Sequence, residues 1–86
     1  MKYKKVEKIY NSFKKEEFIE YFSKIGYENS KDLYVGDGWQ VTVGDEGIRQ
    51  FKGFSLTSVK LTIMVREDIS DQFMRELMVS FLKGGG

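Results

Sequence analysis

The chain ends in three consecutive glycines, Gly84, Gly85 and Gly86. Glycine has no side chain, so a terminal carboxylate preceded by glycine can pass through a narrow enzyme tunnel to reach ATP. Such a carboxylate can be adenylated and then converted to a thiocarboxylate, which makes Gly85 and Gly86 candidate activation residues. Two simpler interpretations stay open, because Gly84 is also an ordinary helix stop and a glycine run can be a cloning remnant.

The residue types that carry most hydrolytic chemistry are missing. The sequence contains no His and no Cys, which excludes zinc fingers, cysteine nucleophiles and Ser-His-Asp triads. Its thirteen Asp and Glu residues are scattered and form no recognised motif. Asp37, Asp45 and Glu46 could meet at one end of a sheet and bind a cation weakly. Hairpin turns at Gly36-Asp37-Gly38 and Gly44-Asp45-Glu46-Gly47 explain these residues more simply, so we predict no enzymatic activity, no metal site and no cofactor.

Length and composition predict a single domain over residues 1–86. Apolar residues make up 41% of the chain and aromatic residues 15%, which argues against disorder. A domain of this size buries only about 60–65% of its unfolded surface, so a homodimer or a stable complex with a partner protein is plausible. The longest apolar stretch falls far short of the roughly 20 residues of a membrane span. No signal peptide is visible, and the absence of Cys fits the cytoplasm.

Two segments have the apolar spacing of amphipathic helices, and the first is expected between Ser12 and Gly26. Ser12 is the expected N-cap, because its hydroxyl can accept a hydrogen bond from a free backbone N–H. A left-handed Gly26 would end the helix and allow Tyr27 to pack back on Phe22.

The second helix is expected after the N-cap Ser70 and continues to Lys83. Its apolar stripe is wide, and Met74 and Met78 lie beside the main row. These two methionines are candidate partner-interface residues, with a place in the core as the simpler alternative.

Alternating apolar residues and glycine-containing turns predict about five strands. They cover residues 3–10, 33–35, 39–43, 48–51 and 54–66. The lysines of the first strand favour a sheet edge. With the helices, the order β-α-β-β-β-β-α predicts an α+β fold, a two-layer sandwich in which two helices cover one face of an antiparallel sheet. That face carries Val59, Leu61, Ile63 and Val65.

This element order and the ending Phe81-Leu82-Lys83-Gly84-Gly85-Gly86 resemble the C-terminal domain of MoaD-related proteins, whose topology is like that of the TATA-binding-protein fold. The resemblance implies a link to molybdenum or tungsten pterin cofactor biosynthesis. It also implies a companion β-grasp, MoaD-like domain on the N-terminal side, which these 86 residues do not contain. No catalytic residues are carried over.

A non-enzymatic accessory or interaction domain ranks above a sulfur carrier on this sequence. In the carrier hypothesis an adenylating enzyme would be the partner and would activate Gly86. A helix that continues to Lys83 leaves only Gly84 to Gly86 free, and three residues reach roughly 10 Å. Threading them would require the last helical turn to unwind.

A nucleic-acid-binding module is the third hypothesis. Residues 1–15 carry a net charge of +5, whereas residues 16–86 carry −4. The basic first strand and the exposed sheet face could bind phosphates and stack bases. Because the whole chain is only +1, protein partners rank above nucleic acid. The candidate phosphate-binding residues are Lys4, Lys5, Lys8, Arg49, Lys52 and Lys60, and the candidate stacking residues are Tyr34, Trp39, Phe51 and Phe54.

Overall fold

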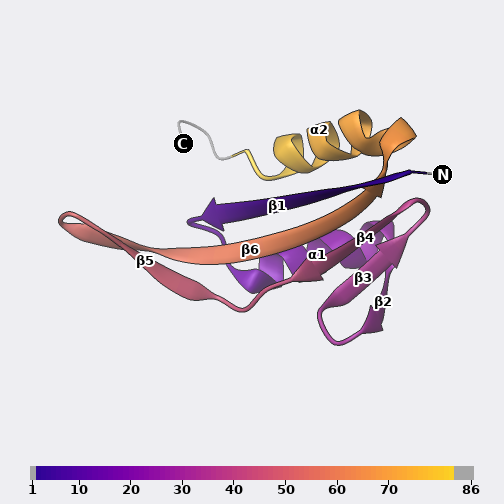
Figure 1. Ribbon diagram of the computed structural model, residues 1–86. Helices are drawn as coiled ribbons and strands as arrows, with labels where there is room; N and C mark the ends of the chain where they lie inside the picture. Colours follow the sequence, from indigo (N-terminus) through magenta and orange to yellow (C-terminus); the bar gives the residue numbers. More distant parts are fainter. Residues whose placement is uncertain (1, 83–86) are drawn as a thin grey trace.

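The computed structural model describes residues 2–82, and Figure 1 shows one curved sheet with two helices. The elements in chain order are β1 (Tyr3–Asn11), α1 (Lys15–Ile25), β2 (Tyr27–Ser30), β3 (Leu33–Gly36), β4 (Trp39–Val43), β5 (Gly47–Phe51), β6 (Phe54–Arg66) and α2 (Ser70–Ser80). The predicted α+β class is confirmed. The sheet has six strands, one more than the sequence indicated, because β2 has no apolar alternation and forms by pairing with β3.

Strand β6 is the centre of the sheet. It pairs antiparallel with β1 on one side and with β4 on the other, in the order β1-β6-β4-β3-β2. The expected edge position of β1 is thus confirmed. We expected a hairpin turn between β4 and β5, and that expectation is wrong. Gly44 N–H donates to the Lys60 carbonyl at 2.8 Å, and β5 continues along β6 beyond the end of β4.

The result is a two-stranded extension, here called the arm, which comprises residues 47–58. Figure 1 shows the arm at the left, projecting away from both helices. Its turn at Lys52 and Gly53 lies between the predicted strands 48–51 and 54–66.

The core lies between the helices and one face of the sheet. Val59, Leu61, Ile63 and Val65 alternate along β6 and are fully buried, as predicted from their period of two. Helix α1 adds Phe18 and Phe22, α2 adds Phe73 and Leu77, and β4 adds Trp39, Val41 and Val43. Both helices therefore cover the same face. The Trp39 ring joins them, since its centroid lies 5.7 Å from that of Phe22 and 5.3 Å from that of Phe73.

Helix α1 begins two residues later than its sequence suggests. Ser12 does not cap it, because Ser12 follows directly on β1, with φ of 74° and its N–H bonded to the Thr57 carbonyl at 2.7 Å. Lys14 is the N-cap residue, and its N–H donates to Glu17 Oε2 at 2.7 Å. Glu17, at the third helical position, thus accepts a hydrogen bond from the backbone N–H of the N-cap residue, as in a capping box.

Gly26 ends α1, but by a different mechanism from the one expected. Its φ of −156° is extended rather than left-handed, and Tyr27, the first residue of β2, pairs with Val35 of β3 instead of packing on Phe22. Glycine is required here for space, because a Cβ atom would lie 2.3 Å from the Val35 carbonyl oxygen and 2.7 Å from the Trp39 ring.

Both ends of α2 also differ from expectation. A 3₁₀ turn over Glu67–Ile69 leads into the helix, so Ile69 is the N-cap. Ser70 is the first helical residue, and its hydroxyl donates to the Glu67 carbonyl at 3.2 Å. The helix ends at Ser80, whereas its pattern suggested Lys83. Among residues 2–82, no helix is long and apolar enough to cross a membrane.

Candidate functional site

The C-terminal end of α2 packs on the core through the aromatic ring of Phe81. Phe81 caps the helix, and its ring stacks on Phe18 with centroids 4.4 Å apart and lies 5.3 Å from the ring of Phe13. The next residue, Leu82, is 70% exposed. The chain therefore leaves the core immediately after Phe81. The candidate activation residues Gly85 and Gly86 lie outside the described residues.

Exposed apolar side chains lie on the last turn of α2, directly after it, and at the end of α1. Met78 is 57% exposed, Val79 62% and Ile25, at the end of α1, 45%. Together with Leu82 these residues form what we call the helix-face patch. Ile25 and Val79 line one groove and Met78 lies on the other flank of α2, so the patch covers both flanks of the helix, and exposed apolar residues that gather in one region indicate an interaction surface.

Two shallow grooves flank α2. Val79 lines a groove between the two helices together with Tyr21 and Ile25. The predicted interface residues Met74 and Met78 line another, between α2 and β1. Met74 is partly buried and packs against the core, whereas Met78 is exposed, so the two methionines differ in how much surface they offer.

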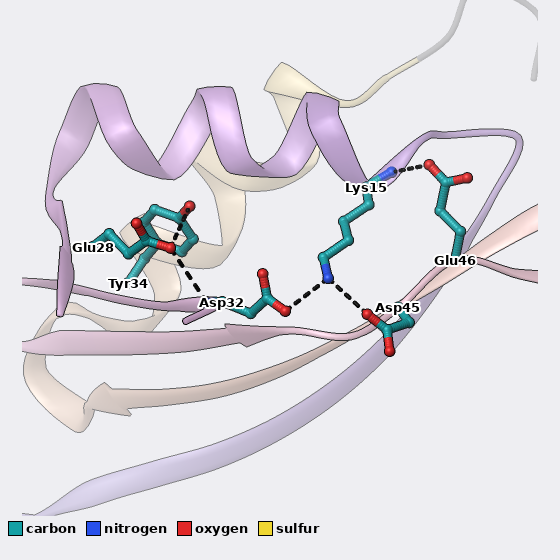
Figure 2. A network of polar contacts seen from close by, with 6 residues as sticks. All are labelled: Lys15, Glu28, Asp32, Tyr34, Asp45 and Glu46. Carbon is teal, nitrogen blue, oxygen red and sulfur yellow. Dashed lines mark hydrogen bonds and ion pairs between the residues drawn. The ribbon is translucent and has the colours of Figure 1, made fainter. Parts of the chain in front are cut away.

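Lys15, at the start of α1, holds three segments together (Figure 2). Its ammonium Nζ lies 2.7 Å from Asp32 Oδ2, in the β2–β3 turn, and 2.7 Å from Asp45 Oδ1, in the β4–β5 connection. The Lys15 backbone N–H donates to Glu46 Oε1 at 2.8 Å. Figure 2 also shows Glu28, which accepts long hydrogen bonds from the Asp32 N–H at 3.4 Å and the Tyr34 hydroxyl at 3.5 Å.

These contacts set the protonation of the charged groups. Hydrogen bonds to Asp32 and then to Asp45 raise the pKa of Lys15 above its ordinary value. The same ammonium lowers the pKa of Asp45. Burial, followed by the nearby charge of Glu28, raises the pKa of Tyr34, which stays neutral. The network is a charged clamp that joins the start of α1 to the β2–β3 turn and to the β4–β5 connection.

The expected meeting of Asp37, Asp45 and Glu46 does not occur. Asp37 lies in the β3–β4 turn, 3.9 Å from the Arg66 guanidinium, while Asp45 and Glu46 bind Lys15. Within residues 2–82, no group of three or more potential ligands could hold a metal ion. The acidic residues therefore neutralise cations of the chain itself.

The candidate phosphate-binding residues are divided between the two sides of the sheet. Lys4 and Lys8 lie opposite the inward-facing Val65 and Leu61 and so share the helix-covered side, whereas Lys5 lies opposite Met64 on the other. Lys60 shares the Lys5 side and lies 3.2 Å from Glu7. Arg49 lies on β5 and Lys52 in the turn of the arm.

The prediction that Tyr34 and Trp39 could stack bases is wrong. Tyr34 and Trp39 are buried under the helices, with 3% and 7% exposure, while Phe51 and Phe54 are exposed on the arm. Sequence reasoning also missed two exposed aromatic residues, Tyr3 at 51% and Tyr27 at 61%. The position of Tyr3 on an alternating edge strand was a usable signal, but that of Tyr27 depended on the unpredicted strand β2.

The described residues thus form a small α+β fold in which two helices cover one face of a six-stranded sheet and leave several apolar side chains exposed. A family model for archaeal MoaD-like proteins matches residues 6–86. The chain therefore belongs to the archaeal MoaD-like family. No curated protein and no solved structure matches it significantly.

Proposed function

We propose that this protein is a non-enzymatic interaction domain that docks on a partner protein through the helix-face patch. The observation that carries the proposal is the exposure of Met78, Val79 and Leu82 around the point where the chain leaves the core. Burying such side chains in an interface contributes about 25 cal/mol per Å² of apolar surface. The proposed partner acts in cytoplasmic molybdenum or tungsten pterin chemistry, an assignment supported by family membership.

The occupant we assign to the patch is an adenylating enzyme of the MoaD-activating type. Such an enzyme must hold a folded domain while it reaches the glycine segment, and the patch directly precedes that segment in the chain. A second copy of this chain is the alternative occupant. The two are distinguishable, because self-association needs no other protein.

Calorimetric titration of the protein into a purified MoaD-activating enzyme tests the docking. Met78→Asp should weaken binding by about ten-fold or more, because it places an unpaired charge in an apolar interface. Ile48→Asp is the matched control, since Ile48 is 72% exposed on the arm, and it should bind like the original protein. Equal binding by both variants would contradict the assignment, as would a dimer in sedimentation that Met78→Asp converts to a monomer.

A sulfur carrier is the second candidate, and one structural finding favours it. Because α2 ends at Ser80 and Leu82 is already exposed, activation does not require the last helical turn to unwind. The five residues from Leu82 to Gly86 span at most about 17 Å when extended. In this mechanism the Gly86 carboxylate attacks the α-phosphorus of ATP and pyrophosphate leaves. A sulfur donor then displaces AMP and yields a thiocarboxylate.

Intact-protein mass spectrometry separates carrier from accessory domain. After incubation with the activating enzyme, ATP and a sulfur donor, a carrier gains the mass difference between sulfur and oxygen. One residue added after Gly86 should abolish the gain, because it removes the glycine carboxylate. An unchanged mass beside a reactive control carrier would leave docking without activation, which is the accessory function.

A further inference from the structure

The sheet face opposite the helices, here called the open face, collects the exposed aromatic residues. Within residues 2–82, four aromatic side chains rank among the exposed large hydrophobic residues: Tyr3 at 51%, Tyr27 at 61%, Phe51 at 38% and Phe54 at 57%. Strand register places all four on the open face. Aromatic side chains carry large apolar surfaces that normally lie in a core or an interface.

The register argument starts from β6, whose odd-numbered residues from Val59 to Val65 point into the core. Its even-numbered residues therefore face the other way. Tyr3 lies opposite Arg66 and Phe51 opposite Phe54, two such even-numbered positions. Tyr27 reaches the same face through the cross-strand row formed by Val35, Gln40 and Met64.

The open face also carries more cationic than acidic side chains. By the same register, Lys5, Lys60, Arg66 and Arg49 lie on the open face. Lys60 pairs with Glu7 at 3.2 Å and Arg66 with Asp68 at 2.6 Å, whereas Lys5 and Arg49 are in none of the ion pairs among the described residues. The arm contains two cations, Arg49 and Lys52, and no Asp or Glu. A face with this balance attracts polyanions, even though the net charge of the whole chain is only +1.

The end of the arm combines both properties. The rings of Phe51 and Phe54 are stacked, with centroids 5.2 Å apart and an angle of 14° between planes. The Arg49 guanidinium carbon lies 6.0 Å from the Phe51 centroid. A planar base can extend such a stack while the neighbouring cations contact its phosphates.

We propose that the open face and the arm bind single-stranded nucleic acid. Single strands are the expected ligand because the bases of a duplex already stack on one another, so rings on a sheet surface cannot reach their faces. The longest dimension of the molecule is 46 Å, and β6 runs for 13 residues along it. A path of this length accommodates several nucleotides, within the range of about 4–16 known for single-strand sites.

Fluorescence anisotropy with labelled oligo-dT and oligo-rU of about 15 nucleotides tests the proposal and separates DNA from RNA. Binding should be measurable at about 50 mM salt and should weaken markedly at about 200 mM. Phe54→Ala should weaken binding about ten-fold through the loss of one stacking partner. Ile48→Ala, an equivalent truncation at a 72% exposed site on the opposite side of the same arm, should leave binding unchanged.

A charge-matched pair of variants keeps the test independent of arm stability. Arg49→Gln with Lys52→Gln should lower the slope of log affinity against log salt by about 1.4, or 0.7 for each lost phosphate contact. Lys4→Gln with Lys8→Gln removes the same net charge from the helix side and should change affinity by less than about two-fold, because those sites contact no phosphate. Equal effects of the two double variants would overturn the proposal. Absence of binding at about 100 µM protein in low salt would overturn it as well, and so would dimers that exclude the oligonucleotide.

Discussion

At the scale of single residues, Lys15 links three segments that are distant in the sequence. One ammonium contacts Asp32 and Asp45, which lie 17 and 30 positions further along the chain. It thereby fixes the start of α1 against two connections of the sheet. No spacing rule links these positions, so the clamp could not be predicted from sequence. The one available signal is the position of Lys15 at a helix start, where its charge opposes the helix dipole and a specific acidic partner is therefore expected.

Replacing Lys15 should change how stability depends on pH. The pKa of Asp45 is lowered in the folded protein, so its contribution is present above about pH 4 and is lost as the pH falls through the folded-state pKa. In Lys15→Met the melting temperature should fall at pH 7, and its decline towards acid pH should become shallower. Thermal melts by circular dichroism between about pH 7 and pH 2 measure this.

Lys24→Met is the control for that measurement, since Lys24 makes only an exposed pair with Glu20 and should preserve the original pH profile. An equally steep acid decline in Lys15→Met would show that Lys15 does not set the pKa of Asp45.

At the scale of elements, the sequence predicted those helices and strands in which the spacing of apolar residues reflects one buried face. The alternation along β4 and β6 and the helical spacing in α1 each have one buried face, and burial produces such patterns directly. Strand β2 was missed because its four residues are all exposed. The end of α2 was misplaced because Phe81 fits the helical spacing yet packs on Phe18 from a non-helical position.

The candidate sites also differ in whether local periodicity defines them. Met78 was predicted as a partner-interface residue because it lies beside the apolar stripe of its helix, and the structure leaves its side chain exposed. An exposed sheet face was predicted, but Tyr3 and Tyr27 on it were missed and the buried Tyr34 and Trp39 were wrongly assigned to it, because membership depends on which side of the sheet each residue occupies. That side is set by long-range register, as when Tyr3 pairs with Arg66. A shift of one residue would place every side chain of β1 on the opposite side.

At the scale of the whole molecule, one core supports two surfaces of different chemistry. Helices α1 and α2 present the helix-face patch, and the opposite side of the sheet presents aromatic and cationic residues. The arm extends the second surface beyond the region that the helices cover (Figure 1). A two-stranded ribbon without a packed layer is only marginally stable by itself, so the arm should contribute little to the cooperative unfolding of the domain.

Two leucines of β6 test this division within one strand. Leu61 is fully buried in the core, whereas Leu56 lies on the arm and is only partly buried. Leu61→Ala should lower the free energy of unfolding by about 2–5 kcal/mol, through lost burial and the cavity left behind. Leu56→Ala should lower it by less than about 1 kcal/mol, because little surrounds that side chain. Urea melts of both variants provide the comparison. A loss below about 0.5 kcal/mol in Leu61→Ala would place the core elsewhere, and a loss in Leu56→Ala equal to that in Leu61→Ala would make the arm part of the cooperative unit.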